Sequence, residues 1–118
     1  MQYLLLIYNT ESNWNSLSEA EGAKILQEFG EFTQSIMSSG HLKGANRLHP
    51  VSKATTVRVQ NGKKLVTDGP FAETKEQLGG YYLIEAKDLD EATAIAARIP
   101  AARMGSIEVR PVWEMQRP

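Results

Sequence analysis

The sequence contains no cysteine, so disulfides, thiolate metal ligands and a cysteine nucleophile are all excluded. It also lacks an excess of charge of either sign. Its 13 Lys and Arg residues are interspersed with 14 Asp and Glu residues, which leaves a net charge of -1. Domains that bind nucleic acid usually present a basic stripe, so we expect no nucleic acid among the partners of this chain.

Long apolar segments are missing as well. The apolar run Tyr3–Tyr8 is far shorter than the roughly 20 residues that a membrane-spanning helix needs. Neither a basic lead nor a small-residue cleavage site, the marks of a secretory signal, accompanies it. We therefore expect no membrane partner and a cytoplasmic location.

What the sequence does contain is the composition of one ordinary globular domain. The chain has 118 residues, of which 42% are hydrophobic and 23% are charged. This length suits a single domain with one core, and the composition argues against disorder. We expect residues 1–118 to form one domain.

The first half of the chain predicts a strand, a helix and a β-hairpin. Residues 3–8 form a continuous apolar run typical of a buried central strand. Ser18 and Glu21 fit a capping box, and Gly40 is a typical helix stop. Between them, apolar residues recur at helical spacing: Ile25, Phe29, Phe32 and Ile36. Further on, residues 54–59 alternate like a strand, and Asn61-Gly62 predicts a tight turn into residues 64–66.

The second half predicts a loop, a strand, a helix and a last strand. Asp68-Gly69-Pro70 is typical of turns, so residues 68–79 are expected to form a loop. Residues 80–86 are expected to form the other central strand. A capping pattern at Asp88 then opens a helix that Pro100 ends, and residues 106–112 form the last strand.

This order of elements predicts an α+β fold, the ferredoxin-like split β-α-β sandwich. Two helices cover one face of such a sheet, and the alternation of side chains places Arg58 and Arg110 on the uncovered face. The central strands are apolar on both faces, so a second copy packed sheet to sheet would cover the open one. The alternative is a monomer whose sheet has one wet face, as antiparallel sheets often do.

One segment is unusually dense in specific choices: Asp68-Gly69-Pro70-Phe71-Ala72-Glu73-Thr74-Lys75-Glu76-Gln77-Leu78-Gly79-Gly80. It closely resembles the signature of the DGPF branch of the YCII-related proteins. The match extends over nearly the whole chain, through the following segments: Thr56-Val57-Arg58-Val59, Gly80-Tyr81-Tyr82, Asp90-Glu91-Ala92, Ile99-Pro100-Ala101 and Glu108-Val109-Arg110-Pro111-Val112.

The resemblance implies a dimeric α+β barrel of ferredoxin-like subunits. Proteins similar to this one often lie beside, or are fused to, extracytoplasmic-function sigma factors, which implies a sigma factor as a partner. Related YCII proteins are thought to use a His–Asp pair in a cleft. Asp68 is the acidic candidate for such a pair, whereas neither His41 nor His49 sits in a matching motif.

The residue types around the signature suggest a site as well. Asp68, held by a stiff Gly-Pro turn, is a candidate catalytic acid or base, or else it only caps its own turn. Arg58 and Arg110 are candidates for an anion clamp, or else they pair with Glu73 and Glu108 across the dimer. Glu73 and Phe71 complete the candidate ligand-binding set, and the ring of Phe71 is expected to insert into apolar surroundings.

Three functions stay open at this point. The first is an enzyme or binder of a small molecule, with a pocket between the sheet, the helices and the loop 68–79. The second is a non-catalytic regulatory partner of a sigma factor, and the third is a purely structural homodimer. Two histidines without cysteines make a metal site a weak prospect, and no phosphate loop or dinucleotide motif is present. We expect neither a metal nor a cofactor.

Overall fold

The computed structural model describes residues 1–114. Its helices and strands follow in this order: β1 (Gln2–Asn9), α1 (Glu11–Asn15), α2 (Glu19–Ser38), β2 (Leu42–Arg47), the 3-10 turn η1 (Val51–Lys53), β3 (Thr55–Gln60), β4 (Lys63–Asp68), β5 (Gln77–Glu85), α3 (Leu89–Ala97), the 3-10 turn η2 (Pro100–Arg103) and β6 (Ser106–Pro111).

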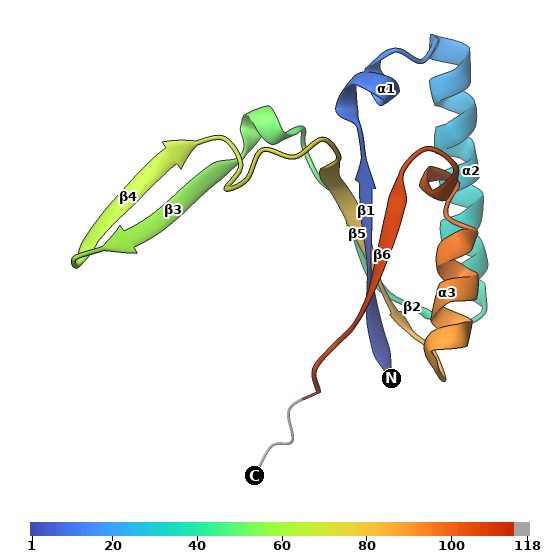
Figure 1. Cartoon of the computed structure of the whole chain (residues 1–118). Helices are drawn as coiled ribbons and strands as arrows, with labels where there is room; N and C mark the ends of the chain where they lie inside the picture. The colour runs from blue at the N-terminus through green and yellow to red at the C-terminus, as the bar shows by residue number, and fades with distance from the viewer. Residues whose placement is uncertain (115–118) are drawn as a thin grey trace.

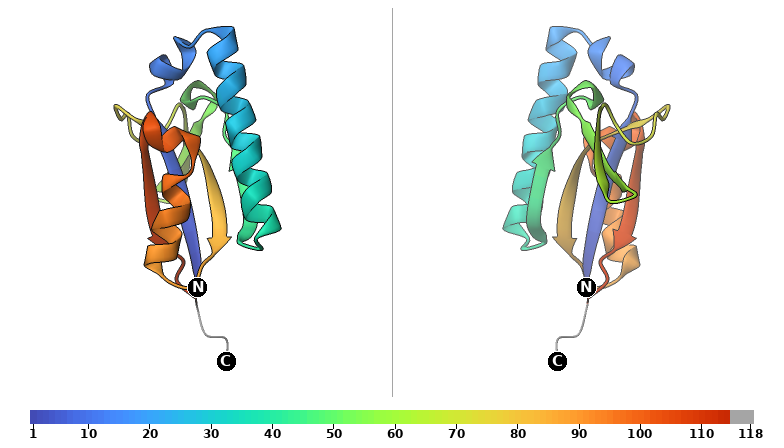
Figure 2. Two further views of the ribbon diagram at one scale, coloured as in Figure 1. Left: turned by 90° about the vertical axis from the view of Figure 1, so that its right-hand side faces the viewer. Right: turned by 90° about the vertical axis from the view of Figure 1, so that its left-hand side faces the viewer.

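Four of the strands form one antiparallel sheet in the order β2-β5-β1-β6. Together with α2 and α3, this is the ferredoxin-like arrangement, with β1 and β5 in the centre as the apolar runs predicted. Figures 1 and 2 show both long helices on the same face of the sheet. The expected α+β sandwich is confirmed.

The core lies between that face and the two helices. Alternate residues of β1 and β5 point toward the helices and are buried, because successive side chains of a strand point to opposite faces. Leu5 and Ile84 meet Ile36 of α2 and Ile95 of α3 in this core. Its aromatic pair is Phe32 and Tyr82, whose rings meet edge to face with centroids 5.2 Å apart.

The helix boundaries follow the capping signals in the sequence. The Ser18 hydroxyl accepts a hydrogen bond from the backbone N–H of Glu21, and the Glu21 carboxylate accepts one from the N–H of Ser18. Asp88 caps α3 by accepting a hydrogen bond from the N–H of Glu91. Gly40 follows α2 with a φ of 81°, a left-handed conformation that glycine adopts at little cost.

The second strand of the sheet differs from the expectation. The strand at 54–59 was predicted to belong to the sheet, but the edge position beside β5 is taken by β2, which the sequence pattern did not indicate. Strands β3 and β4 pair only with each other and project from the open face of the sheet, near the end where α1 lies (Figure 1). We call this hairpin, Thr55–Asp68, the arm.

The turn of the arm was predicted correctly. Asn61 and Gly62 both have positive φ, 52° and 75°, as a two-residue hairpin turn requires. At the base of the arm, the N–H of Gly69 donates to the Ala54 carbonyl over 2.7 Å, and the Thr56 hydroxyl donates to the Gly69 carbonyl over 2.8 Å. The hairpin is thus closed at both ends.

The described residues contain no helix that is both long and apolar enough to cross a membrane.

Candidate functional site

A cavity of about 350 Å³ opens at the end of the sheet where β1 leads into α1. This volume lies within the range of about 300–1,000 Å³ that is usual for small-molecule pockets. Its walls come from the end of β1, from α1, from the middle of α2, from the end of β2 with the segment that follows it, and from the first residues of β5. Most of its lining is apolar or aromatic: Ile7, Trp14, Leu26, Phe29, Ala45, Leu48, Pro50, Leu78, Tyr81 and Tyr82.

The floor of the cavity depends on two glycines in β5. The pairing of β1 with β5 shifts between Ile7, opposite Gly80, and Tyr8, opposite Leu78, so Gly79 is the extra residue of a bulge. A Cβ at Gly80 would lie 2.9 Å from the Asn46 carbonyl oxygen. Glycine therefore lets β2 approach β5 closely, and the bulge bends the strand at the cavity.

An aromatic wall separates the cavity from the core. The Thr33 hydroxyl donates to the Phe29 carbonyl over 2.8 Å, so the Tyr82 hydroxyl, 2.7 Å from it, is the donor of that pair. Burial raises the pKa of Tyr82, and the hydrogen bond with Thr33 opposes that shift only in part. Tyr82 is therefore a neutral, fixed element of the wall.

Glu11 ties together three elements around the cavity. One of its carboxylate oxygens accepts a hydrogen bond from the backbone N–H of Val51 over 2.8 Å. Its own N–H donates to the side-chain oxygen of Gln77 over 3.0 Å, and the Gln77 amide donates to the Thr74 carbonyl over 2.8 Å. Glu11 of α1 is thus fixed at the cavity through its carboxylate by η1 and through its backbone N–H by the start of β5.

A cation also lies at this cavity. The guanidinium of Arg47 stacks on the ring of Trp14, 5.4 Å from its centroid. Within residues 1–114, Arg47 has no carboxylate within salt-bridge distance. His49 follows two residues later and lines the same cavity.

This arrangement suits a flat, largely apolar molecule with a polar or acidic group at one end. The aromatic side chains offer faces for stacking, and a guanidinium can donate two parallel hydrogen bonds to a carboxylate or phenolate. Among the described residues, no group of three His, Asp or Glu side chains is arranged to hold a metal ion. Glu11 and His49 add an acidic and an imidazole side chain to the lining of the cavity.

The structure places Asp68, Arg58 and Phe71 on the arm and at its base. Asp68 is exposed at the end of β4, and its carboxylate makes no hydrogen bond within the described chain. The guanidinium of Arg58 lies over the ring of Phe71, 5.3 Å from its centroid. The expectation that this ring is buried is wrong for the single chain, because Phe71 is 75% exposed.

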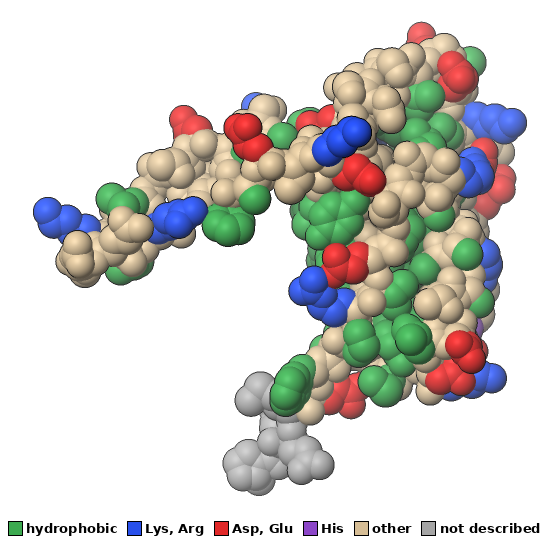
Figure 3. Space-filling view, in the orientation of Figure 1, with side chains coloured by type: hydrophobic (Ala, Val, Ile, Leu, Met, Phe, Trp, Pro, Cys, Tyr) green, Lys and Arg blue, Asp and Glu red, His purple; other side chains and the backbone are tan. Residues whose placement is uncertain are grey.

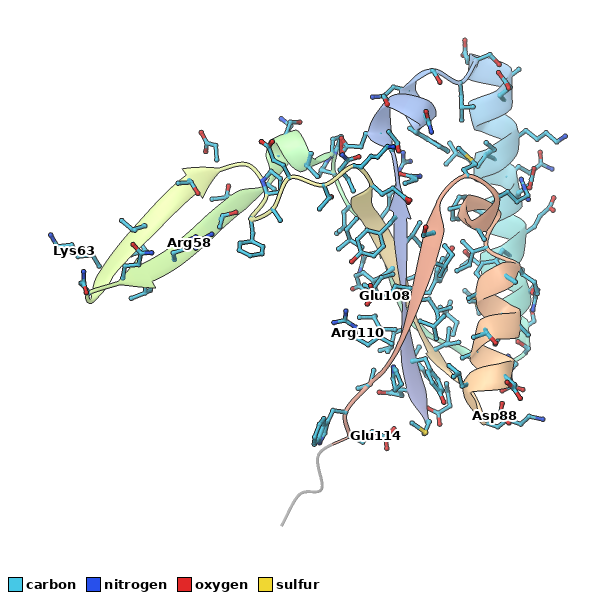
Figure 4. All side chains as sticks on the ribbon, viewed as in Figure 1. Arg58, Lys63, Asp88, Glu108, Arg110 and Glu114 are labelled. Atoms are coloured by element: carbon cyan, nitrogen blue, oxygen red, sulfur yellow. The ribbon has the colours of Figure 1, made fainter. Side chains whose placement is uncertain are left out.

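Arg110 lies elsewhere, on the open face of the four-stranded sheet, where it forms an ion pair with Glu108 two residues earlier in β6. Figure 4 shows Arg58 out on the arm and Arg110 on the sheet, well apart. Glu73 is exposed in the loop between β4 and β5. One copy of the chain therefore brings together Arg58 and Phe71 only, and none of these five residues lines the cavity.

The residues that do line it were not selected from the sequence. Glu11 and Arg47 come from segments that carry no motif, and only the fold brings them beside Gln77, which lies in the signature segment 68–80. One signal was available. Two consecutive glycines, Gly79-Gly80, at the start of an apolar strand indicate a bulge or a close approach of backbones, which often occurs beside a binding site.

Comparisons with known proteins show the family and the fold of the chain. A model of the YCII-related domain matches residues 1–116. An uncharacterized protein of Rhizobium meliloti (strain 1021) is 40% identical over 114 residues, which cover 95% of this chain and 92% of that protein. Among solved structures, 5-chloro-2-hydroxyhydroquinone dehydrochlorinase from Burkholderia phenoliruptrix AC1100, in complex with 2,5-dihydroxybenzoquinone, has a TM-score of 0.56 at 11% identity. That match covers 98% of this chain and 96% of the enzyme.

Proposed function

The chain belongs to the YCII-related family, and we propose that it is a small-molecule-binding protein whose ligand is a planar, acidic compound held in the cavity beside Arg47. The observation that carries this proposal is the position of Arg47 at a mostly apolar cavity, stacked on Trp14 and without a carboxylate partner within residues 1–114. An anionic group of a ligand would supply the missing partner.

The fold neighbour supports the chemical class. Its structure holds 2,5-dihydroxybenzoquinone, a flat ring with acidic hydroxyl groups. A molecule of this kind matches the aromatic lining and the cation found here. Because that enzyme shares only the fold with this chain, its reaction is not part of the proposal.

Binding can be measured through Trp14. In a Trp113→Phe background, Trp14 is the remaining tryptophan, so a ligand in the cavity should quench its fluorescence saturably. The probes are 2,5-dihydroxybenzoquinone and 4-hydroxybenzoate, with benzyl alcohol as the uncharged comparison. Isothermal titration calorimetry gives the affinities independently of fluorescence.

Arg47→Gln should weaken binding of the two acidic probes about tenfold or more, because a charge-assisted hydrogen bond contributes roughly 1.5–3 kcal/mol. The matched control is Lys43→Gln, which removes a cation of the same strand that does not line the cavity. Equal losses of affinity for both variants would show that the effect comes from the net charge and not from a contact with Arg47. Absence of saturable binding by all three probes would contradict the proposed ligand class.

A finer prediction concerns Asp68 as an acid or base, with Arg58, Glu73, Phe71 and Arg110 as ligand contacts. These residues do not meet within one chain, so such a site needs a second copy. Asp68→Asn keeps the size of the side chain and removes its charge and basicity. If Asp68 belongs to a site, ligand binding or turnover should fall while self-association holds; the reverse outcome would assign Asp68 to the interface between copies.

The regulatory alternative, a partner protein for an extracytoplasmic-function sigma factor, and the assignment to the DGPF branch both stay predictions from the resemblance of residues 68–80.

A further inference from the structure

The arm has no partner within the described chain. Its two strands pair with each other and with no strand of the sheet. Figures 1 and 2 show it on the side of the sheet opposite the helices, projecting away from the open face. A hairpin of two strands is marginally stable at best when both of its faces are in water.

Both faces of the arm carry apolar side chains. Because partners across the hairpin share a face, Val57, Val66 and Val59 lie on one face and Leu65 lies on the other, with Arg58 and its stacked ring Phe71. All five apolar side chains are strongly exposed: Val57 57%, Val59 71%, Leu65 43%, Val66 53% and Phe71 75%. Exposed apolar side chains in this number indicate that another surface covers the arm.

The charges of the arm indicate which surface covers it. The arm is basic, with Arg58, Lys63 and Lys64 against Asp68, and Figure 3 shows Lys and Arg side chains on its outer part. Helices α1 and α2 are acidic, with five glutamates against Lys24. Of these glutamates, Glu28 is already paired with Arg103 over 2.6 Å, and the Glu11 carboxylate accepts a hydrogen bond from the Val51 N–H. The arm and the helical segment are therefore complementary in charge; Figure 1 shows the arm and α2 on opposite sides of the sheet, with α1 at the end of the sheet.

The geometry lets two copies use this complementarity. The arm leaves the sheet near the end where α1 lies and where α2 begins (Figure 1). Two sheets that pack face to face lie about 10 Å apart, and strands of six residues are about 20 Å long. If the two-fold axis runs along the strands, the α1 ends of both copies lie side by side. The arm of one copy is then long enough to pass the partner's sheet and reach its helical layer.

We propose that the arm is an exchanged element, which docks on α1 and the first half of α2 of a second copy of this chain. Each helical segment so covered forms a wall of its own copy's cavity, through Trp14 and Leu26. The arm of one copy therefore braces the binding cavity of the other. This inference does not depend on the identity of the ligand, and its tests need none.

The first test measures self-association by sedimentation. The full chain should sediment at twice 13.1 kDa at micromolar concentration. Val66→Glu should raise the dimer dissociation constant about tenfold or more, because it places a charge on the covered face. The matched control is Met37→Glu, in an apolar side chain of similar exposure (55% against 53%) near the far end of α2, which should change the constant less than about twofold.

Removing the arm gives a stronger test. Thr55 and Asp68 are cross-strand partners, so an Asn-Gly turn can join them in place of residues 56–67. This variant should keep its helical circular dichroism and sediment as a monomer. A full chain that is monomeric, or a Val66→Glu variant that dimerises as tightly as the unaltered chain, would overturn the proposal even if the shortened variant failed to fold.

Disulfide cross-linking can locate the docking surface. Because the sequence has no cysteine, only the introduced cysteines can form disulfides. A Lys64→Cys variant, at the outer end of the arm, is mixed and oxidised with either Ser12→Cys in α1 or Ser38→Cys at the end of α2. All three positions are exposed. The proposal expects a mixed disulfide with Ser12→Cys in clear excess. An excess with Ser38→Cys, or disulfides between two arms only, would contradict this docking site.

Discussion

At the scale of single residues, Gly105 illustrates how closely the chain packs where β6 begins. A Cβ at this position would overlap the Tyr8 carbonyl oxygen and lie 2.9 Å from the Cβ of Asn9. Backbone atoms of the central strand β1 cannot give way as the end of a flexible side chain can. Glycine is therefore required here for space.

Gly105→Ala should lower the free energy of unfolding by about 2 kcal/mol or more, as steric overlap in packed structure usually does. Gly30→Ala is the matched control, since a Cβ at Gly30 in the middle of α2 meets nothing within 4 Å. It should stabilise the chain by up to about 1 kcal/mol through helix propensity. Urea unfolding followed by circular dichroism distinguishes the two; equal effects would contradict the steric explanation.

Phe71 and Phe32 form a second contrast between residues of one type. Phe32 is 5% exposed in the core, whereas Phe71 is 75% exposed and contacts Arg58. Phe32→Ala should cost about 3–5 kcal/mol, and Phe71→Ala less than about 1 kcal/mol, when unfolding of the monomer is followed at high dilution. A large loss for Phe71→Ala in the monomer would show that the ring has apolar contacts within its own chain.

At the scale of elements, the sequence predicted the features that are determined by residues close together in the chain. The helix starts at Ser18 and Asp88 were readable because a cap is made by residues three positions apart. The turn at Asn61-Gly62 was readable for the same reason, since positive φ selects those residues. The central positions of β1 and β5 followed from their apolar runs, because only a strand covered on at least one face is stabilised by such a sequence.

The remaining elements depend on contacts that are remote in sequence. Strand β2 reads Leu-Lys-Gly-Ala-Asn-Arg, without apolar alternation, and is held by pairing with β5 at the edge of the sheet. The β-branched alternation of residues 54–59 is the same for a strand in a sheet and for one in a projecting arm. The sequence predicted a pocket between the sheet, the helices and the loop 68–79, and residues 77–79 line the cavity. Its other lining residues could not be predicted, since they meet only once β2 occupies the edge of the sheet.

The carboxylates at the helix starts predict that the stability of the folded chain depends on pH. Hydrogen bonds from the backbone N–H of Ser18 and of Lys87 lower the pKa of Glu21 and of Glu91, respectively, below the usual 4.5. A carboxyl whose pKa is lower in the folded state binds fewer protons there than in the unfolded state. Its contribution to stability is therefore complete above pH 4.5 and is lost as the pH falls through the folded value.

Thermal unfolding between pH 7 and pH 3 tests this prediction. Glu21→Gln should make the fall in melting temperature below pH 4.5 shallower, because the substituted amide does not titrate. Glu19→Gln is the control, since Glu19 lies in the same first turn and takes no part in the capping box. Identical pH profiles for Glu21→Gln and the unaltered chain would show that the cap does not contribute to the acid sensitivity.

At the scale of the whole molecule, the open face of the sheet carries an apolar strip. Residues of β1 and β5 that alternate with the buried ones point to this face and are only partly covered: Leu4, Leu6, Tyr81 and Leu83. Beside them, the ion pair of Arg110 with Glu108 lies on the strand next to β1. An apolar strip with a charged margin is the pattern of a surface that a partner covers.

We predict a homodimer that packs through these open faces, with the arms as its second contact. Leu83→Glu places a charge in the middle of the strip, opposite Leu4, and should convert the dimer to a monomer at micromolar concentration, because burying an unpaired carboxylate is costly. Leu89→Glu, an exposed leucine at the start of α3, is the matched control and should leave the dimer intact. The helical circular dichroism of both variants should match that of the unaltered chain, which separates loss of association from loss of fold. A Leu83→Glu chain that still sediments at twice 13.1 kDa would mean that the sheet faces do not meet. If the arm variant Val66→Glu weakened the same dimer, the arms alone would then join the two copies.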